Sequence, residues 1–108
     1  MSEFAGTLNQ RVELLRPTPD RTEAGLSLRT WERFARCLAS VVPDGAGAES
    51  EGMSLSALPR FRAVIRMRRD VAVDHKLLWR GRPLLIKQII EDPRTPDRMQ
   101  LRCEEMRS

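Results

Sequence analysis

Hydrophobic and polar positions alternate most clearly between residues 60 and 68. One parity of this segment carries only apolar side chains, namely Phe61, Ala63, Ile65 and Met67. Four of the five positions on the other parity are arginines, namely Arg60, Arg62, Arg66 and Arg68. A period of two is typical of a strand that buries one face and exposes the other. The pattern therefore predicts a strand with an apolar face and a cationic face.

Other short segments also have strand-like patterns. Residues 77–79 and 84–90 are rich in apolar side chains and flank the turn sequence at 80–83, which predicts a hairpin. Residues 99–104 alternate after a turn-rich stretch, and residues 10–16 alternate until Pro17 stops the pattern. Residues 28–42 fit either a helix or a strand whose inner side chains are small, so their pattern leaves both open.

A long loop is predicted from residue 44 to residue 59. The segment is rich in small residues, contains three glycines and lacks a clear period. Loops of this length are uncommon in compact folds and are usually functional or mobile. Its large apolar side chains are Met53, Leu55 and Leu58. Because such side chains are a liability when exposed, we expect partner contact at least as much as packing within the chain.

Five or six short strands within 108 residues predict a mainly β fold. The pattern fits a small antiparallel barrel or sandwich, and we take a small antiparallel β-barrel with one long inter-strand loop as the prediction. The length allows one domain, covering residues 1–108. A chain this short has little core with which to wall a catalytic cleft. We therefore expect a small binding or assembly module.

The charge balance is moderately basic, with 19 Lys and Arg against 15 Asp and Glu, and seventeen of the cations are arginines. Arg69 extends the arginine ladder of residues 60–68. The ladder has three interpretations: a solvated outer face, a track for DNA phosphates, or a surface that pairs with carboxylates of an adjacent subunit. The chain lacks tyrosine and is only 5% aromatic, which disfavours a single-strand binder. The arginine bias fits the subunit contact best.

The sequence offers no set of residues for catalysis, and we expect no enzyme activity. His75 is the single histidine and lies between two charged residues, which is typical of a solvated turn. Neither a nucleophile elbow nor a phosphate-binding glycine loop is present. Cys37 and Cys103 lie far apart without a neighbouring ligand, so we expect reduced thiols, no metal and no cofactor. No apolar run is long enough to span a membrane.

Taken together, the order of these features resembles the phage head-tail joining, or stopper, family. The resemblance rests on the segments 8–15, 23–25 with Trp31, 37–41, the acidic pair Glu49 and Glu51, 61–68, 81–86 and 101–105. No single motif is diagnostic, but the set runs over nearly the whole chain. Leu84 departs from the pattern, since relatives often carry tyrosine there.

This resemblance implies a β-barrel that assembles into a homo-oligomeric ring below the portal and adaptor rings, closes the DNA channel and docks the tail terminator or tail tube. A hexamer is expected, with a dodecamer as the alternative. The loop at 44–59 would then face the channel, and its candidate gating residues are Ala46, Gly47, Glu49, Glu51, Met53, Leu55 and Leu58. Arg60, Arg62, Arg66, Arg68 and Arg69 are the candidates for subunit contact or for proximity to packaged DNA.

The resemblance also implies a bacterial cytoplasmic location during assembly, and then a place in the neck of a phage or of a phage-like particle such as a gene transfer agent. Two alternative functions are open. The first is a stand-alone nucleic-acid-binding barrel with steep salt dependence. The second is another connector layer, either an adaptor or a tail terminator.

Overall fold

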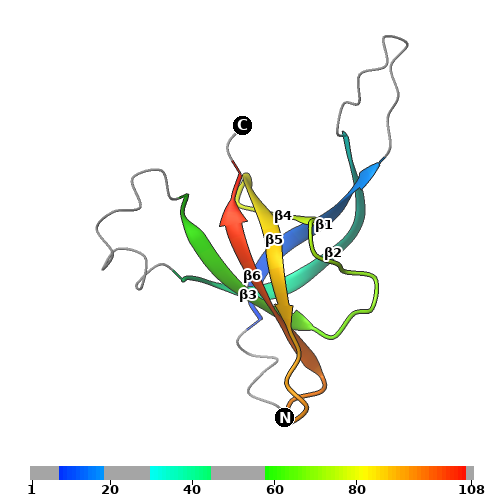
Figure 1. The fold of residues 1–108 in the computed structure, drawn as a ribbon, viewed down its shortest axis with the longest axis vertical. Coiled ribbons are helices and arrows are strands. Elements are labelled where there is room, and N and C mark those ends of the chain that lie inside the picture. Colours follow the sequence, from blue (N-terminus) through cyan, green and yellow to red (C-terminus); the bar gives the residue numbers. More distant parts are fainter. Residues whose placement is uncertain (1–7, 19–29, 45–57, 107–108) are drawn as a thin grey trace.

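Six antiparallel strands form the fold in the computed structural model, which describes residues 8–18, 30–44 and 58–106. In chain order they are β1 (Gln10–Thr18), β2 (Thr30–Pro43), β3 (Arg60–Arg66), β4 (Lys76–Trp79), β5 (Arg82–Ile90) and β6 (Arg98–Glu105). They close into a barrel in the order β1-β2-β3-β6-β5-β4 (Figure 1). The described residues contain no helix. The predicted mainly β barrel is therefore confirmed.

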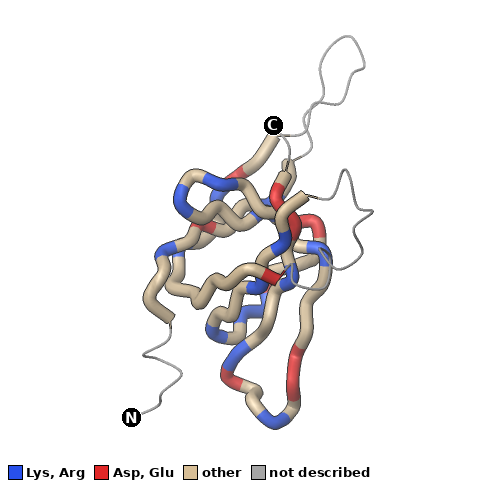
Figure 2. The backbone as a smooth tube through the Cα atoms, turned by 90° about the vertical axis from the view of Figure 1, so that its left-hand side faces the viewer, with Lys and Arg blue, Asp and Glu red and all other residues tan. Residues whose placement is uncertain are grey.

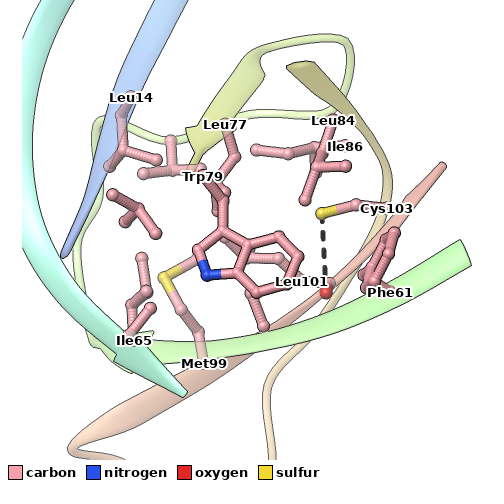
Figure 3. Packing of buried hydrophobic residues seen from close by; sticks show 14 residues of the cluster. Leu14, Phe61, Ile65, Leu77, Trp79, Leu84, Ile86, Met99, Leu101 and Cys103 are labelled. Carbon is pink, nitrogen blue, oxygen red and sulfur yellow. Dashed lines mark hydrogen bonds between the residues drawn. The ribbon is translucent and has the colours of Figure 1, made fainter. Parts of the chain in front are cut away.

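The interior of the barrel is filled by apolar side chains from all six strands (Figure 3). On β3 the buried positions are Phe61, Ala63 and Ile65, and the arginines of that strand are exposed. The alternation in the sequence thus identified the inner face of this strand correctly. The buried indole of Trp79 donates its N–H to Gln10 Oε1 at 3.2 Å, so its one polar atom is satisfied.

Two β-bulges shift the alternation within long strands. On β2, Ala35 pairs with Leu14 while Arg33 pairs with Leu15, which leaves Phe34 as an extra residue. The bulge changes which parity faces inward, so Arg33 is exposed although it has the same parity as Ala35 and Cys37, which pack against the core. On β5, Lys87 is the extra residue, and the inner positions change from Leu84 and Ile86 to Ile89.

The ambiguous segment at 28–42 is resolved as the strand β2. Its inner face is small, as the strand alternative required: Ala39 is fully buried, and Ala35, Cys37 and Val41 pack against the core. Pairing with β1 on one side and β3 on the other satisfies its backbone. A helix would have placed Leu38 beside the other apolar residues, but Leu38 is outside the barrel and 47% exposed.

Two strand ends differ from the prediction. β1 continues through Pro17 to Thr18, because beyond Leu15 it pairs only with β2 and a missing N–H is tolerated on an edge. β3 ends at Arg66, two residues earlier than the alternation predicted. Met67 still donates its backbone N–H to Asp97 O at 3.0 Å, after which Arg68 turns away to bind Asp70.

The predicted hairpin between β4 and β5 is confirmed and turns over two residues, Arg80 and Gly81. Both have positive φ, of 55° and 76°. This combination is that of a type I′ turn, which matches the twist of the paired strands and suits glycine at the second position. β5 then starts at Arg82, so the turn is shorter than the predicted segment 80–83.

Most of the predicted loop at 44–59 lies outside the described residues, including Ala46, Gly47, Glu49, Glu51, Met53 and Leu55. Its two ends are described and lie side by side. The Asp44 N–H donates to Arg60 O at 2.9 Å, and the Glu105 N–H donates to Pro59 O at 2.8 Å. Leu58 is half-buried. The barrel therefore holds both ends of the loop at its β2–β3 corner.

We predict that Leu101→Ala lowers the free energy of unfolding by about 2–5 kcal/mol, because this fully buried side chain leaves a cavity when truncated. Leu38→Ala is the matched control. Since Leu38 is largely exposed, its truncation should change stability by less than about 0.5 kcal/mol. Urea denaturation of both variants measures the difference. Similar losses in the two variants would contradict the assigned core.

We also predict that the Cys103 thiol is unreactive in the folded chain at pH 8, because burial raises its pKa to about 12. The ordinary pKa of a cysteine thiol is 9.0, which applies in the unfolded chain. The folded state therefore holds its proton longer, and stability should fall as the pH rises from about 9 toward 12. Thiol labelling with and without urea tests this, with Cys103→Ser identifying the slow site. Rapid labelling of Cys103 in the folded chain would contradict the prediction.

Candidate interaction surfaces

The outer face of the β3–β6 pair carries two arginine pairs in direct register. Arg62 lies opposite Arg102, and Arg66 lies opposite Arg98. The two pairs are four residues apart, or about 13 Å along the strands, and partners across the strands have Cα atoms about 5 Å apart. We call these four residues the arginine quartet. Like charges placed directly opposite on neighbouring strands destabilise a sheet.

Neutral residues occupy the centre of the quartet, where Val64 lies opposite Gln100. Two described carboxylates form ion pairs with the quartet at its perimeter. Arg102 Nε is 3.2 Å from Asp44 Oδ2, and Arg98 Nε is 3.3 Å from Asp97 Oδ1. Such solvent-accessible ion pairs contribute little stability and are easily exchanged. Arg62 has no ion-pair partner within the described segments.

The structure separates the arginines singled out in the sequence. Arg60, Arg62 and Arg66 are exposed on β3, and Arg60 lies opposite Glu104. Arg68 lies beyond the strand and binds Asp70 with two hydrogen bonds of 2.9 Å. These bonds raise the pKa of Arg68 and lower that of Asp70. Arg69 is exposed in the connection that follows.

Sequence reasoning missed Arg98 and Arg102 as members of this surface. The alternation at 99–104 did place Arg102 on the outer parity of a strand. However, it could not show that β6 pairs with β3, nor that the register sets arginine against arginine. The grouping therefore depends on tertiary pairing, for which the residue pattern contains no signal.

A groove of about 700 Å³ lies on the outside of the barrel over β1, β2 and β4. Its polar lining includes Arg11, Glu13, Arg36 and Arg80, and its apolar lining includes Leu38 and Leu78. Glu13 is 3.4 Å from Arg33 and 3.8 Å from Arg36. In the circular strand order, β1 and β4 lie opposite β6 and β3, but β2 lies next to β3. Leu38 of the groove also lines a second pocket together with Arg66, so the groove adjoins one end of the quartet. Both surfaces are predominantly cationic.

Cations also stack on aromatic rings where β1, β2 and β4 meet. Arg16 lies 4.5 Å from the centroid of Phe34, whose ring meets His75 edge-on at 5.3 Å. Lys76 lies 4.5 Å from the centroid of Trp31. Burial, aided by Arg16, lowers the pKa of His75. His75 follows the turn at 73–74, as expected, but it is half-buried: the imidazole packs on a ring and accepts the Ala72 N–H at Nδ1.

Arg82 and Glu105 close one end of the barrel. Two hydrogen bonds of 2.6 and 3.1 Å join them, and the guanidinium covers the ring of Phe61 at 4.9 Å. The hydrogen bonds from Arg82 lower the pKa of Glu105. This arrangement resembles a structural clamp more than a reactive site.

Chemical groups for catalysis do not converge in the part of the chain that the structure describes. No group of three or more His, Cys, Asp or Glu side chains there could hold a metal ion. Cys37 and Cys103 are both free thiols, the first half-buried and the second buried. Nor do the described segments contain a helix long and apolar enough to cross a membrane.

Comparison with solved structures shows that this fold occurs elsewhere. Protein SF1141 from Shigella flexneri 2a superposes with a TM-score of 0.71 and 24% identity, covering 93% of this chain and 94% of that one. A chain from the virion of a native gene transfer agent particle gives a TM-score of 0.66 at 17% identity, covering 94% and 97%. The phage-like element PBSX protein xkdH from Bacillus subtilis gives 0.49 at 9% identity, covering 89% and 92%.

Comparison with curated protein sequences gave no significant match. The sequence model of a phage head completion protein does match, from residue 5 to residue 106. This match includes all six strands and the segments that join them. Because it covers nearly the whole sequence, the chain belongs to the phage head completion protein family.

Proposed function

We propose that this protein is a structural subunit of a head-tail connector, and specifically a stopper. The observation that carries the proposal is the family match over residues 5–106. In this role the subunits form a ring beneath the portal and adaptor rings, close the DNA channel after packaging, and present a docking surface to the tail terminator or tail tube. The protein acts by assembly and not by catalysis.

The outer surface of β2 supports a role in ring contacts. Leu38 and Val42 project from it and are 47% and 38% exposed. Leu38 also lines the groove beside Arg11 and Arg36. An apolar centre with arginines around it is a frequent composition of protein interfaces. A heterologous contact of this kind closes into a ring when the rotation between subunits allows it.

The segment 46–58 is proposed to face the channel. Two observations support this: the segment 44–59 carries three carboxylates and no Lys or Arg, and its two ends are held together at one corner of the barrel. An acidic segment would repel packaged DNA and would not bind it. In this role it would contact neighbouring subunits and change conformation on assembly or tail attachment.

Imaging of particles tests the connector layer and the symmetry of the ring. We expect cryo-electron microscopy of particles that carry this protein to show six barrels between the adaptor ring and the tail. Twelve barrels would indicate the alternative stoichiometry. Density in the adaptor or tail-terminator layer would contradict the stopper assignment, and a protein missing from the particle would contradict the connector role itself.

We predict that Leu38→Glu strongly reduces ring formation and the yield of tailed particles, because it places a carboxylate in the proposed contact. Val73→Glu is a matched control, since Val73 is also 47% exposed but lies in the β3–β4 connection. Native mass spectrometry measures the ring, and electron microscopy counts tailed particles. Equal behaviour of the two variants would argue against the contact.

Deletion of residues 47–56 should release packaged DNA and reduce tail attachment, while the barrel stays folded. The ends of the loop are hydrogen-bonded neighbours, so shortening it need not strain β2 or β3. Unchanged urea denaturation of the isolated variant is the control. Normal DNA retention together with normal tailing would rule out a channel role for this segment.

A further inference from the structure

We propose that the arginine quartet binds the phosphate backbone of double-stranded DNA directly and without sequence preference. The inference rests on the proposed function only for the source of the DNA, which is the filled head. The contact itself follows from charge, register and surface composition.

Charge is the first argument. Sixteen of the nineteen Lys and Arg residues lie in the described segments with ten of the fifteen Asp and Glu, which gives this part of the chain a formal charge of +6 (Figure 2). Within the quartet, Arg62 and Arg102 repel each other in the isolated subunit. Asp44 offsets part of this repulsion, since its carboxylate lies 3.2 Å from Arg102. A phosphate placed between the opposed arginines would reduce the repulsion further.

Geometry is the second argument. The quartet covers about 13 Å along the strands. Double-stranded DNA carries one negative charge per about 1.7 Å of its axis, so several phosphates fall within this length. Guanidinium groups bind phosphate oxygens through planar paired donors. Four arginines can therefore neutralise up to about four phosphates, which predicts a salt dependence of about −3.6 in log K against log salt.

The composition of the face indicates which anion it fits. Single-strand binders stack bases on aromatic side chains, but Phe61 and Trp79 are buried inside the barrel and Phe34 packs on His75. The centre of the quartet, with Gln100 and half-buried Val64, offers little apolar area for a protein contact. Packing of the groove of a second copy against the quartet is unfavourable too, because arginines predominate among the charged residues of that groove. Duplex DNA fits these conditions best.

Fluorescence anisotropy of the full chain with a labelled 30-base-pair duplex, titrated from about 50 to 300 mM NaCl, tests the inference. The wild-type chain should show a slope near −3.6. Arg62→Gln should reduce its magnitude by about one, and Arg62→Gln combined with Arg102→Gln by about two. At 100 mM salt the double variant should bind on the order of 50-fold more weakly.

Matched controls separate a specific face from diffuse charge and from unfolding. Arg33→Gln combined with Arg94→Gln removes two cations outside the quartet and should leave the slope unchanged. Arg62→Gln should keep or raise the melting temperature, because it removes an opposed charge without breaking an ion pair of the described residues. Equal losses in both double variants would overturn the inference.

Two further results would also overturn it. One is the absence of duplex binding at 50 mM NaCl. The other is salt-sensitive self-association that Arg62→Gln abolishes without any effect on DNA, which would assign the quartet to an acidic protein surface. Should DNA binding fail while Leu38→Glu still blocks ring assembly, the connector role stands and the DNA contact alone is wrong.

Discussion

Closure of the barrel is the constraint on which the rest of the structure depends. Each of the six strands pairs on both sides over at least part of its length, so the backbone is satisfied around the barrel and the inner side chains meet in one apolar core. None of the described buried positions is polar or charged. Every ionisable group that takes part in binding is consequently displaced to the outside. A small barrel of this kind works through its outer faces.

Where the strands are regular, the sequence pattern correctly predicted which side chains are buried and which are exposed. On β3 the alternation identified the buried Phe61, Ala63 and Ile65 and the exposed arginines. It failed where one extra residue shifts the pleat, as at Phe34 on β2 and Lys87 on β5. A bulge inserts one extra residue, and neither bulge here is marked by a characteristic residue type. The change in parity beyond it is therefore visible only from the strand pairing.

The residues that share a candidate surface were harder to predict from the sequence than the buried faces of the strands. Exposure of Arg60, Arg62 and Arg66 was predictable from parity, but their partners were not. Arg98 and Arg102 join them only because β6 returns to pair with β3 in a particular register. The sequence also could not show that Arg68 is withdrawn from this face by Asp70 two residues later. Local pattern thus predicted the kind of residue on a face, and topology decided which residues share it.

Pro17 has a different place in the structure from the one that the sequence pattern predicted. It was expected to stop β1, yet the strand passes through it, and beyond Leu15 only β2 lies alongside. There the two strands form a ribbon that leaves the barrel, and no other described strand lies along the second edge of β1 (Figure 1). Unpaired edges are templates on which strands of other chains can add, and proline is one of the residues by which proteins limit such addition. A residue that resembled the end of a strand thus lies within one, on the kind of open edge where a missing N–H makes the addition of a further strand less favourable.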